Sequence, residues 1–147
     1  LHVRSRRQRQ MCIRDSDHGV DLYGNGVMVS RALLRDRPEA VAGLVRAIHR
    51  AVLDTIADPD AAIAALAKRE PLLDAALEKR RLLYTLRTVM LTPAVAQAGI
   101  GDVDDARMGR AIAQLRTAFE LPRAPAPGEV FDRRFLPPAA ARRVVAS

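Results

Sequence analysis

Apolar residues recur at intervals of three and four along most of the chain, which is the spacing of an amphipathic helix. The clearest run consists of Val41, Leu44, Val45, Ile48, Val52 and Ile56. Pro38 precedes it and suits the first turn of a helix, because the N–H that proline lacks would have no partner there. We therefore predict a helix that begins at Pro38 and ends at Asp58-Pro59.

Further helices are predicted by the same period together with cap residues and prolines. Two such helix starts are Asp58-Pro59 and Thr92-Pro93. In each pair the first side chain can accept a hydrogen bond from a free backbone N–H of the helix, and the proline suits the first helical turn. Gly99 and Gly101 are expected to end the short helix that follows Thr92-Pro93. The segments expected to be helical are residues 31–37, 38–57, 59–70, 72–91, 93–98 and 104–120.

Val27-Met28-Val29 departs from this helical pattern. It is a short apolar run with β-branched residues, bounded by turn residues, and it predicts a short buried strand. A single strand leaves its backbone N–H and C=O groups unpaired. Its partner is therefore expected in a hairpin that the pattern does not show or outside this chain, which favours a truncated protein. The predicted fold class is mostly α with one short strand.

Residues 1–16, "LHVRSRRQRQMCIRDS", have no hydrophobic periodicity and contain five arginines and the sole cysteine, Cys12. The part "RRQRQMCIRDS" resembles translated adaptor sequence, so we assign residues 1–16 as non-native and disordered and leave them out of the fold. A basic arm for nucleic acid is the alternative. In the other 131 residues, 19 basic and 16 acidic side chains are interspersed, which argues against a nucleic-acid-binding module.

Beyond that segment, we expect a helical region over residues 17–121 and a proline-rich extended tail over residues 122–147. No apolar run follows the early arginines, so no signal peptide is expected in this chain.

The stretch "DLYGNGVMVS" contains a Gly-x-Gly, Gly24-Asn25-Gly26. A phosphate-binding loop follows a strand and opens a helix, whereas here the loop precedes the apolar run and no third glycine follows. Gly24 and Gly26 are instead expected to provide positive φ or a close backbone approach, which would turn the chain into Val27. Tyr23 and Asn25 would then offer a flat ring and an amide on a rigid corner. A plain turn with a packed tyrosine is the alternative.

Other reactive side chains do not form a recognisable site. Three aspartates and a histidine gather before the glycine loop: Asp15, Asp17, His18 and Asp21. A calcium loop fails there, since Val20 stands where glycine is required and Gly26 where glutamate is required. His49 has no second ligand at i+4 and is interpreted as a residue at the boundary of the apolar stripe. We predict no catalytic residue, no metal site and no cofactor.

Several pieces taken in order resemble the carboxyl-terminal part of ABC-transporter substrate-binding proteins of the thiamine-pyrimidine/sulfonate/nitrate type. The pieces, within residues 17–138, are "YGNGVMVS", "RPEAV", "ADPDAAIAAL", "KREPLLD", "LTPAV" and "RAPAPGEVF". The resemblance implies the carboxyl-terminal part of a two-lobed α/β periplasmic-binding-protein fold of type II, with ligand bound in the cleft. The segment like "YGNG" would lie near that cleft, and the strand after it would join a sheet from the amino-terminal half.

The same resemblance implies the solute-binding component of an ABC importer, periplasmic or otherwise extracytoplasmic. Its partners would be ABC permease subunits and a small organic solute, such as a thiamine-pyrimidine precursor or a sulfonate, and the full-length protein would be a monomer. Tyr23, Asn25 and Gly24 become the candidate ligand-binding residues, although the isolated chain is not expected to bind solute tightly. One branch of the family, the fungal thiamine-pyrimidine synthase, is an enzyme associated with a cysteine-rich motif and a donor histidine. Neither is matched here, so we expect no enzyme; the alternative is a free-standing basic helical interaction or regulatory module.

Overall fold

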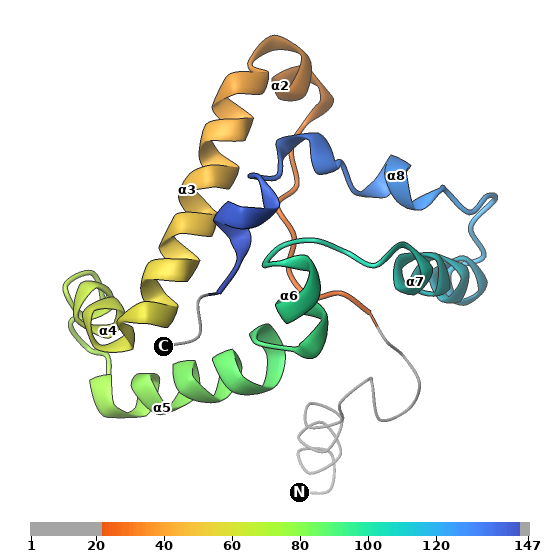
Figure 1. The fold of residues 1–147 in the computed structure, drawn as a ribbon. Coiled ribbons are helices and arrows are strands. Elements are labelled where there is room, and N and C mark those ends of the chain that lie inside the picture. The colour runs from red at the N-terminus through yellow and green to blue at the C-terminus, as the bar shows by residue number, and fades with distance from the viewer. Residues whose placement is uncertain (1–21, 145–147) are drawn as a thin grey trace, which may run out of the picture. The chain divides into compact units, whose positions relative to one another are not determined.

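The computed structural model describes residues 22–144 of the chain. Helices account for 67% of these residues and none of them lies in a β-strand, which confirms the prediction of a mostly helical chain. The chain forms two compact units (Figure 1). Unit 1 contains the described residues 22–27 and 103–132, and unit 2 contains 28–102 and 133–144. The segment 1–16, with Cys12, lies outside the described residues.

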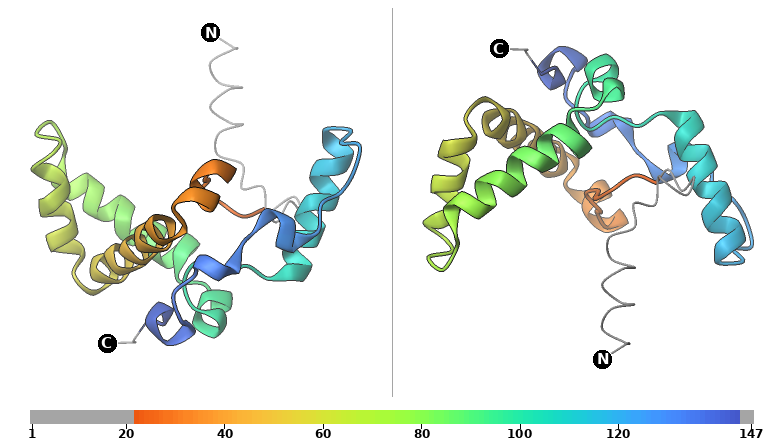
Figure 2. Two further views of the ribbon diagram at one scale, coloured as in Figure 1. Left: turned by 90° about the horizontal axis from the view of Figure 1, so that it is seen from above. Right: turned by 90° about the horizontal axis from the view of Figure 1, so that it is seen from below.

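Unit 2 is built mainly on two long helices joined through a shorter one, as Figure 1 shows. Its elements are α2 (Arg31–Asp36), α3 (Pro38–Ala57), α4 (Pro59–Ala67), α5 (Ala75–Thr85), the π-turn η2 (Leu86–Met90), α6 (Pro93–Ala98) and the short 3₁₀ turns η3 (Arg133–Phe135) and η4 (Ala139–Arg142). α4 packs against both α3 and α5. In both views of Figure 2, α4 lies between the end of α3 and the start of α5. The apolar side chains buried in this unit are Val41, Ile63 and Leu86.

Side-chain caps explain where the helices begin. At the start of α2, α4, α5 and α6, a side-chain oxygen of the cap residue accepts a hydrogen bond from the backbone N–H three residues later. The cap residues are Ser30, Asp58, Asp74 and Thr92. The helix predicted over 72–91 therefore starts only after Asp74, and its last turn widens into η2. None of the described helices is both long and apolar enough to cross a membrane.

The buried face of α3 differs from the predicted stripe. Val41 is 3% exposed and His49 is 8% exposed, whereas Leu44 is 50% exposed. The face that packs inward follows a spacing of four, so Leu44 and Ile48 fall on its solvent edge. The interpretation of His49 as a boundary residue is thus wrong: it is buried.

The short buried strand predicted at Val27-Met28-Val29 is also absent. These residues have no regular secondary structure, Val27 is 52% exposed and Met28 is 96% exposed. A strand needs a neighbouring strand for its hydrogen bonds, and no other described segment forms one.

Unit 1 consists of α7 (Asp105–Ala118), the short α8 (Pro127–Val130) and the segment 22–27. Ala111 and Ile112 are buried on α7. The helix ends in a left-handed residue, Glu120, at φ 50°, and the next N–H, that of Leu121, donates to the Arg116 carbonyl at 3.0 Å. The proline-rich region expected as an extended tail contains α8, η3 and η4.

Glu129 secures the start of α8. Its carboxylate accepts from Arg123 through Nη1 at 3.0 Å and Nη2 at 3.1 Å, and from the Ala126 N–H at 2.7 Å. The hydrogen bond from Arg123, and after it the one from Ala126, hold the pKa of the Glu129 carboxyl below its usual value. Because the folded-state pKa is lowered, the stability this carboxylate contributes is present above its unfolded pKa and is lost as pH falls through its folded pKa.

We therefore expect the Glu129 side chain to titrate at lower pH than a free glutamate in an NMR pH titration. Replacing its main partner, Arg123→Gln, should raise the Glu129 pKa toward the ordinary value. An unchanged Glu129 titration curve in that variant would show that the Arg123 contact is not maintained in solution.

Candidate functional site

Tyr23 lies against the start of α7 within unit 1. Its hydroxyl oxygen accepts from the Asp104 N–H at 2.6 Å and lies 3.4 Å from the Asp104 carbonyl oxygen. The Asp104 carboxylate in turn accepts from the Arg107 N–H at 2.6 Å, which caps α7. The Tyr23 hydroxyl is therefore engaged by the protein itself.

Arg107 covers the same tyrosine from the first turn of α7. Its guanidinium carbon lies 4.2 Å from the centroid of the Tyr23 ring, and Nη2 donates to the Leu22 carbonyl at 2.8 Å. A cation over an aromatic face contributes about 0.5–1 kcal/mol at exposed sites and more when water is excluded. Arg107 thus contacts both the ring of Tyr23 and the backbone that leads into it.

Gly24 and Asn25 follow this anchored tyrosine and are exposed. Neither Gly24 nor Gly26 has positive φ, and a Cβ added at either would meet no atom within 4 Å. We expected these glycines to adopt positive φ or to allow another described segment to approach the backbone closely; this expectation is wrong. The structure brings Tyr23, Gly24 and Asn25 into one loop, the Tyr23 loop (22–26), whose open side carries Gly24 and Asn25.

A second cluster of polar side chains lies in unit 2, around Arg142. This residue is 6% exposed. Its guanidinium donates to the carbonyls of Pro137 (2.9 Å), Ala98 (3.0 Å) and Ile100 (3.2 Å). A fourth contact, from Nη2 to the Asp102 carboxylate, measures 3.2 Å.

The loop that Arg142 contacts, residues 98–102, depends on two glycines with left-handed backbone. Gly99 has φ 82° and Gly101 has φ 81°. A Cβ on Gly101 would lie 2.5 Å from His49 Nε2, which is closer than real Cβ contacts. Nε2 of His49 lies 3.2 Å from the Ile100 carbonyl and Nδ1 lies 2.9 Å from the Val45 carbonyl. These contacts fix the loop between α3 and the segment that ends at Arg142.

Residues 1–62 match the family model described as NMT1/THI5 like. This match confirms the resemblance over residues 17–62, which include the Tyr23 loop, α2, α3 and the start of α4. Comparison with curated proteins and with solved structures finds no significant match.

Each of the two clusters combines residues from inside the matched segment 1–62 with residues from outside it. The matched segment contains Tyr23 and His49, whereas Arg107 and Arg142 come from the remainder of the chain. Neither arginine was singled out from the sequence, because both stand among other charged residues in ordinary helical or proline-rich surroundings. The two left-handed glycines, Gly99 and Gly101, were the one signal that a closely packed partner was required.

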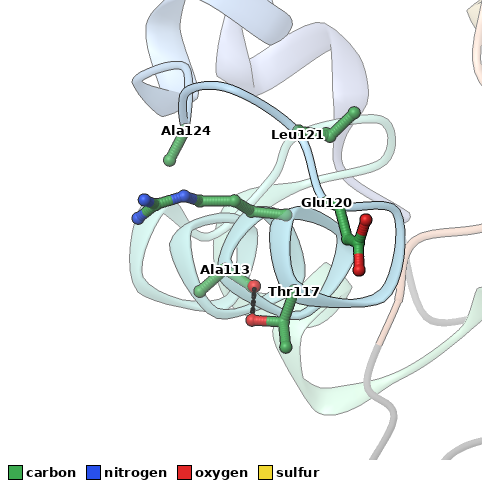
Figure 3. A pocket seen from close by; sticks show the side chains of 6 residues that line it. Ala113, Thr117, Glu120, Leu121 and Ala124 are labelled. Atoms are coloured by element: carbon green, nitrogen blue, oxygen red, sulfur yellow. Dashed lines mark hydrogen bonds between the residues drawn. The ribbon is translucent and has the colours of Figure 1, made fainter.

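A shallow hollow of about 470 Å³ lies at the other end of α7 from Tyr23 (Figure 3). It is lined by Ala113, Arg116, Thr117, Glu120, Leu121 and Ala124. The Thr117 hydroxyl donates to the Ala113 carbonyl at 3.2 Å, so that hydroxyl is already used within the helix. The hollow contains none of the predicted ligand-binding residues.

Residues 22–144 contain no group of three or more His, Cys, Asp or Glu side chains placed to hold a metal ion. Of the four residues considered from the sequence, Asp15, Asp17, His18 and Asp21 all lie outside the described range.

Proposed function

We propose that this protein is a solute-binding component of an ABC importer and acts by binding rather than by catalysis. The observation that supports this is the NMT1/THI5-like match over residues 1–62, which contains the Tyr23 loop. The solute would be a small organic molecule, such as a thiamine-pyrimidine precursor or a sulfonate, and the permease subunits would be its partners at the membrane. Such a protein works outside the cytoplasm, where closure on the solute presents a surface to the permease.

Within this proposal, the Tyr23 loop forms part of the solute site: Gly24 and Asn25 face the solute, and Tyr23 belongs to the site as the residue that anchors the loop. Asn25 is exposed and its amide offers both a donor and an acceptor. Gly24 has no side chain, so a planar molecule could approach its backbone. No atom of the described chain lies within 4 Å of the position that a Cβ would take there. These features suit a polar planar ring or an oxyanion group better than a bulky apolar ligand.

The test is to follow the amide signals of the ¹⁵N-labelled chain while a thiamine-pyrimidine precursor, taurine or nitrate is added to millimolar concentration. We expect the amides of Gly24, Asn25 and Gly26 to shift with one of these solutes and to saturate. Weak affinity is sufficient, since a Kd near 1 mM still corresponds to about 4 kcal/mol of binding free energy. If none of the three solutes shifts these amides, the proposed function is wrong.

Gly24→Ala sharpens this test, because the added methyl meets no atom of the described chain and should leave the fold intact. If solute lies against the backbone, the variant should weaken binding about tenfold, or about 1.4 kcal/mol. Gly128→Ala is the matched control, since a Cβ there also meets nothing within 4 Å and Gly128 lies in the same unit, on α8. Equal affinity in both variants would place the solute away from Gly24.

A further inference from the structure

The contacts of Tyr23 divide the loop into a part that anchors and a part that faces outward. The Tyr23 hydroxyl accepts a hydrogen bond from the Asp104 N–H at 2.6 Å, and the Arg107 guanidinium carbon lies 4.2 Å from the centroid of the ring, over one face. The two groups that would make tyrosine a good ligand contact, its hydroxyl and its aromatic face, are thus both engaged by α7. Asn25, two residues further along, is exposed.

We infer that Arg107 is a positioning residue for solute binding, which acts by holding Tyr23 and so fixing the backbone from Gly24 to Gly26. This inference rests on the proposed function for its binding consequence, but its structural part stands on the contacts alone. Tyr23 then serves as the anchor of the loop. Solute is recognised by the Asn25 amide and by the backbone of Gly24 and Gly26.

The reason for an arginine at this position lies in its shape. A planar guanidinium stacks on the Tyr23 ring and at the same time donates from its edge to the Leu22 carbonyl at 2.8 Å. The ammonium of lysine is a point charge, which can approach the ring but has no flat face to stack and no fork of donors. The two contacts hold two consecutive residues, Leu22 and Tyr23, directly before Gly24 and Gly26, whose backbone has no side chain to restrict it.

The decisive comparison is Arg107→Gln against Arg110→Gln. Both residues lie on α7, and glutamine has nearly the helix propensity of arginine, so α7 should persist in either variant. We expect the Gly24, Asn25 and Gly26 amides to move toward averaged shifts, and the Asp104 N–H to exchange faster with solvent, only in Arg107→Gln. Unchanged amides in Arg107→Gln, or the same changes in Arg110→Gln, would overturn the inference.

Solute affinity provides the second measurement. With the solute identified as above, Arg107→Gln should weaken binding about tenfold and Arg107→Lys less, while Arg110→Gln binds as the unaltered chain does. Equal affinity in Arg107→Gln and Arg110→Gln would show that the clamp does not position the binding groups. If no solute binds the unaltered chain, the proposed function fails, and the amide comparison still decides whether Arg107 holds the loop.

Discussion

Arg142→Ala is expected to lower the free energy of unfolding of unit 2 by about 3 kcal/mol, the cost of removing one partner from a buried, hydrogen-bonded ion pair. The substitution removes the donor that serves three backbone carbonyls, and it takes one guanidinium away from the Asp102 carboxylate, which is 18% exposed and keeps its contact with Arg133 at 2.8 Å. A buried acceptor without a donor loses free energy because it has also lost water. Urea denaturation followed by far-ultraviolet circular dichroism measures this change, since α3, α4 and α5 dominate the signal of unit 2.

Arg143→Ala is the control for this prediction. Arg143 is the next residue and carries the same charge, but it is exposed. We expect a change within about 0.5 kcal/mol, as for most surface substitutions. Similar losses in the two variants would indicate that Arg142 is not buried in solution and that the contact with residues 98–102 does not hold.

Gly101→Ala is the second large effect, with an expected loss of about 3 kcal/mol from two causes that act together. The residue has φ 81°, where a side chain is strained, and the new Cβ would lie 2.5 Å from His49 Nε2. His49 is buried on α3 and cannot move away without giving up its contacts with the Val45 and Ile100 carbonyls. The same denaturation experiment measures the loss.

Gly43→Ala offers a control of opposite sign in the same unit. Gly43 lies inside α3. The atom nearest to a Cβ added there would be Arg46 Nη2 at 3.8 Å, an ordinary van der Waals distance. Alanine is favoured over glycine in a helix interior by about 0.8–1 kcal/mol, so this variant should be more stable. If Gly101→Ala were as stable as Gly43→Ala, the left-handed loop and its packing against His49 would be wrong.

The helices could be predicted well from the sequence because their signals are local. Asp58-Pro59 and Thr92-Pro93 start α4 and α6 as expected, since a cap and the residue it serves are only three positions apart. The start of α5 was placed too early, because the cap Asp74 stands inside an apolar run that continues the helical period. The strand failed for the opposite reason: Val27-Met28-Val29 has the right composition, but a strand depends on a neighbour that local composition does not reveal.

The sites were less predictable because their partners are distant in the sequence. Tyr23 was identified, yet Arg107 and Asp104, which hold it, lie 84 and 81 residues further on. Arg142 contacts Ala98 and Asp102, which precede it by 44 and 40 residues. Pattern and spacing cannot reveal such pairs when each member is an ordinary charged residue. The match of residues 1–62 to the NMT1/THI5-like model includes neither Arg107 nor Arg142 and assigns no role to them.

The contacts of Arg142 also set the order in which the protein can be completed during translation. Unit 2 includes residues 28–102 and 133–144, so its chain leaves after Asp102 and returns only after the 30 residues, 103–132, that belong to unit 1. A ribosome delivers α2 to α6 first, but the carbonyls of residues 98–102 obtain their arginine only when residue 142 has left the exit tunnel. The loop of the nascent α3–α6 segment therefore stays open until then. A ribosome stalled before residue 142 should hold a protease-sensitive intermediate, which closes only after residue 142 has left the tunnel.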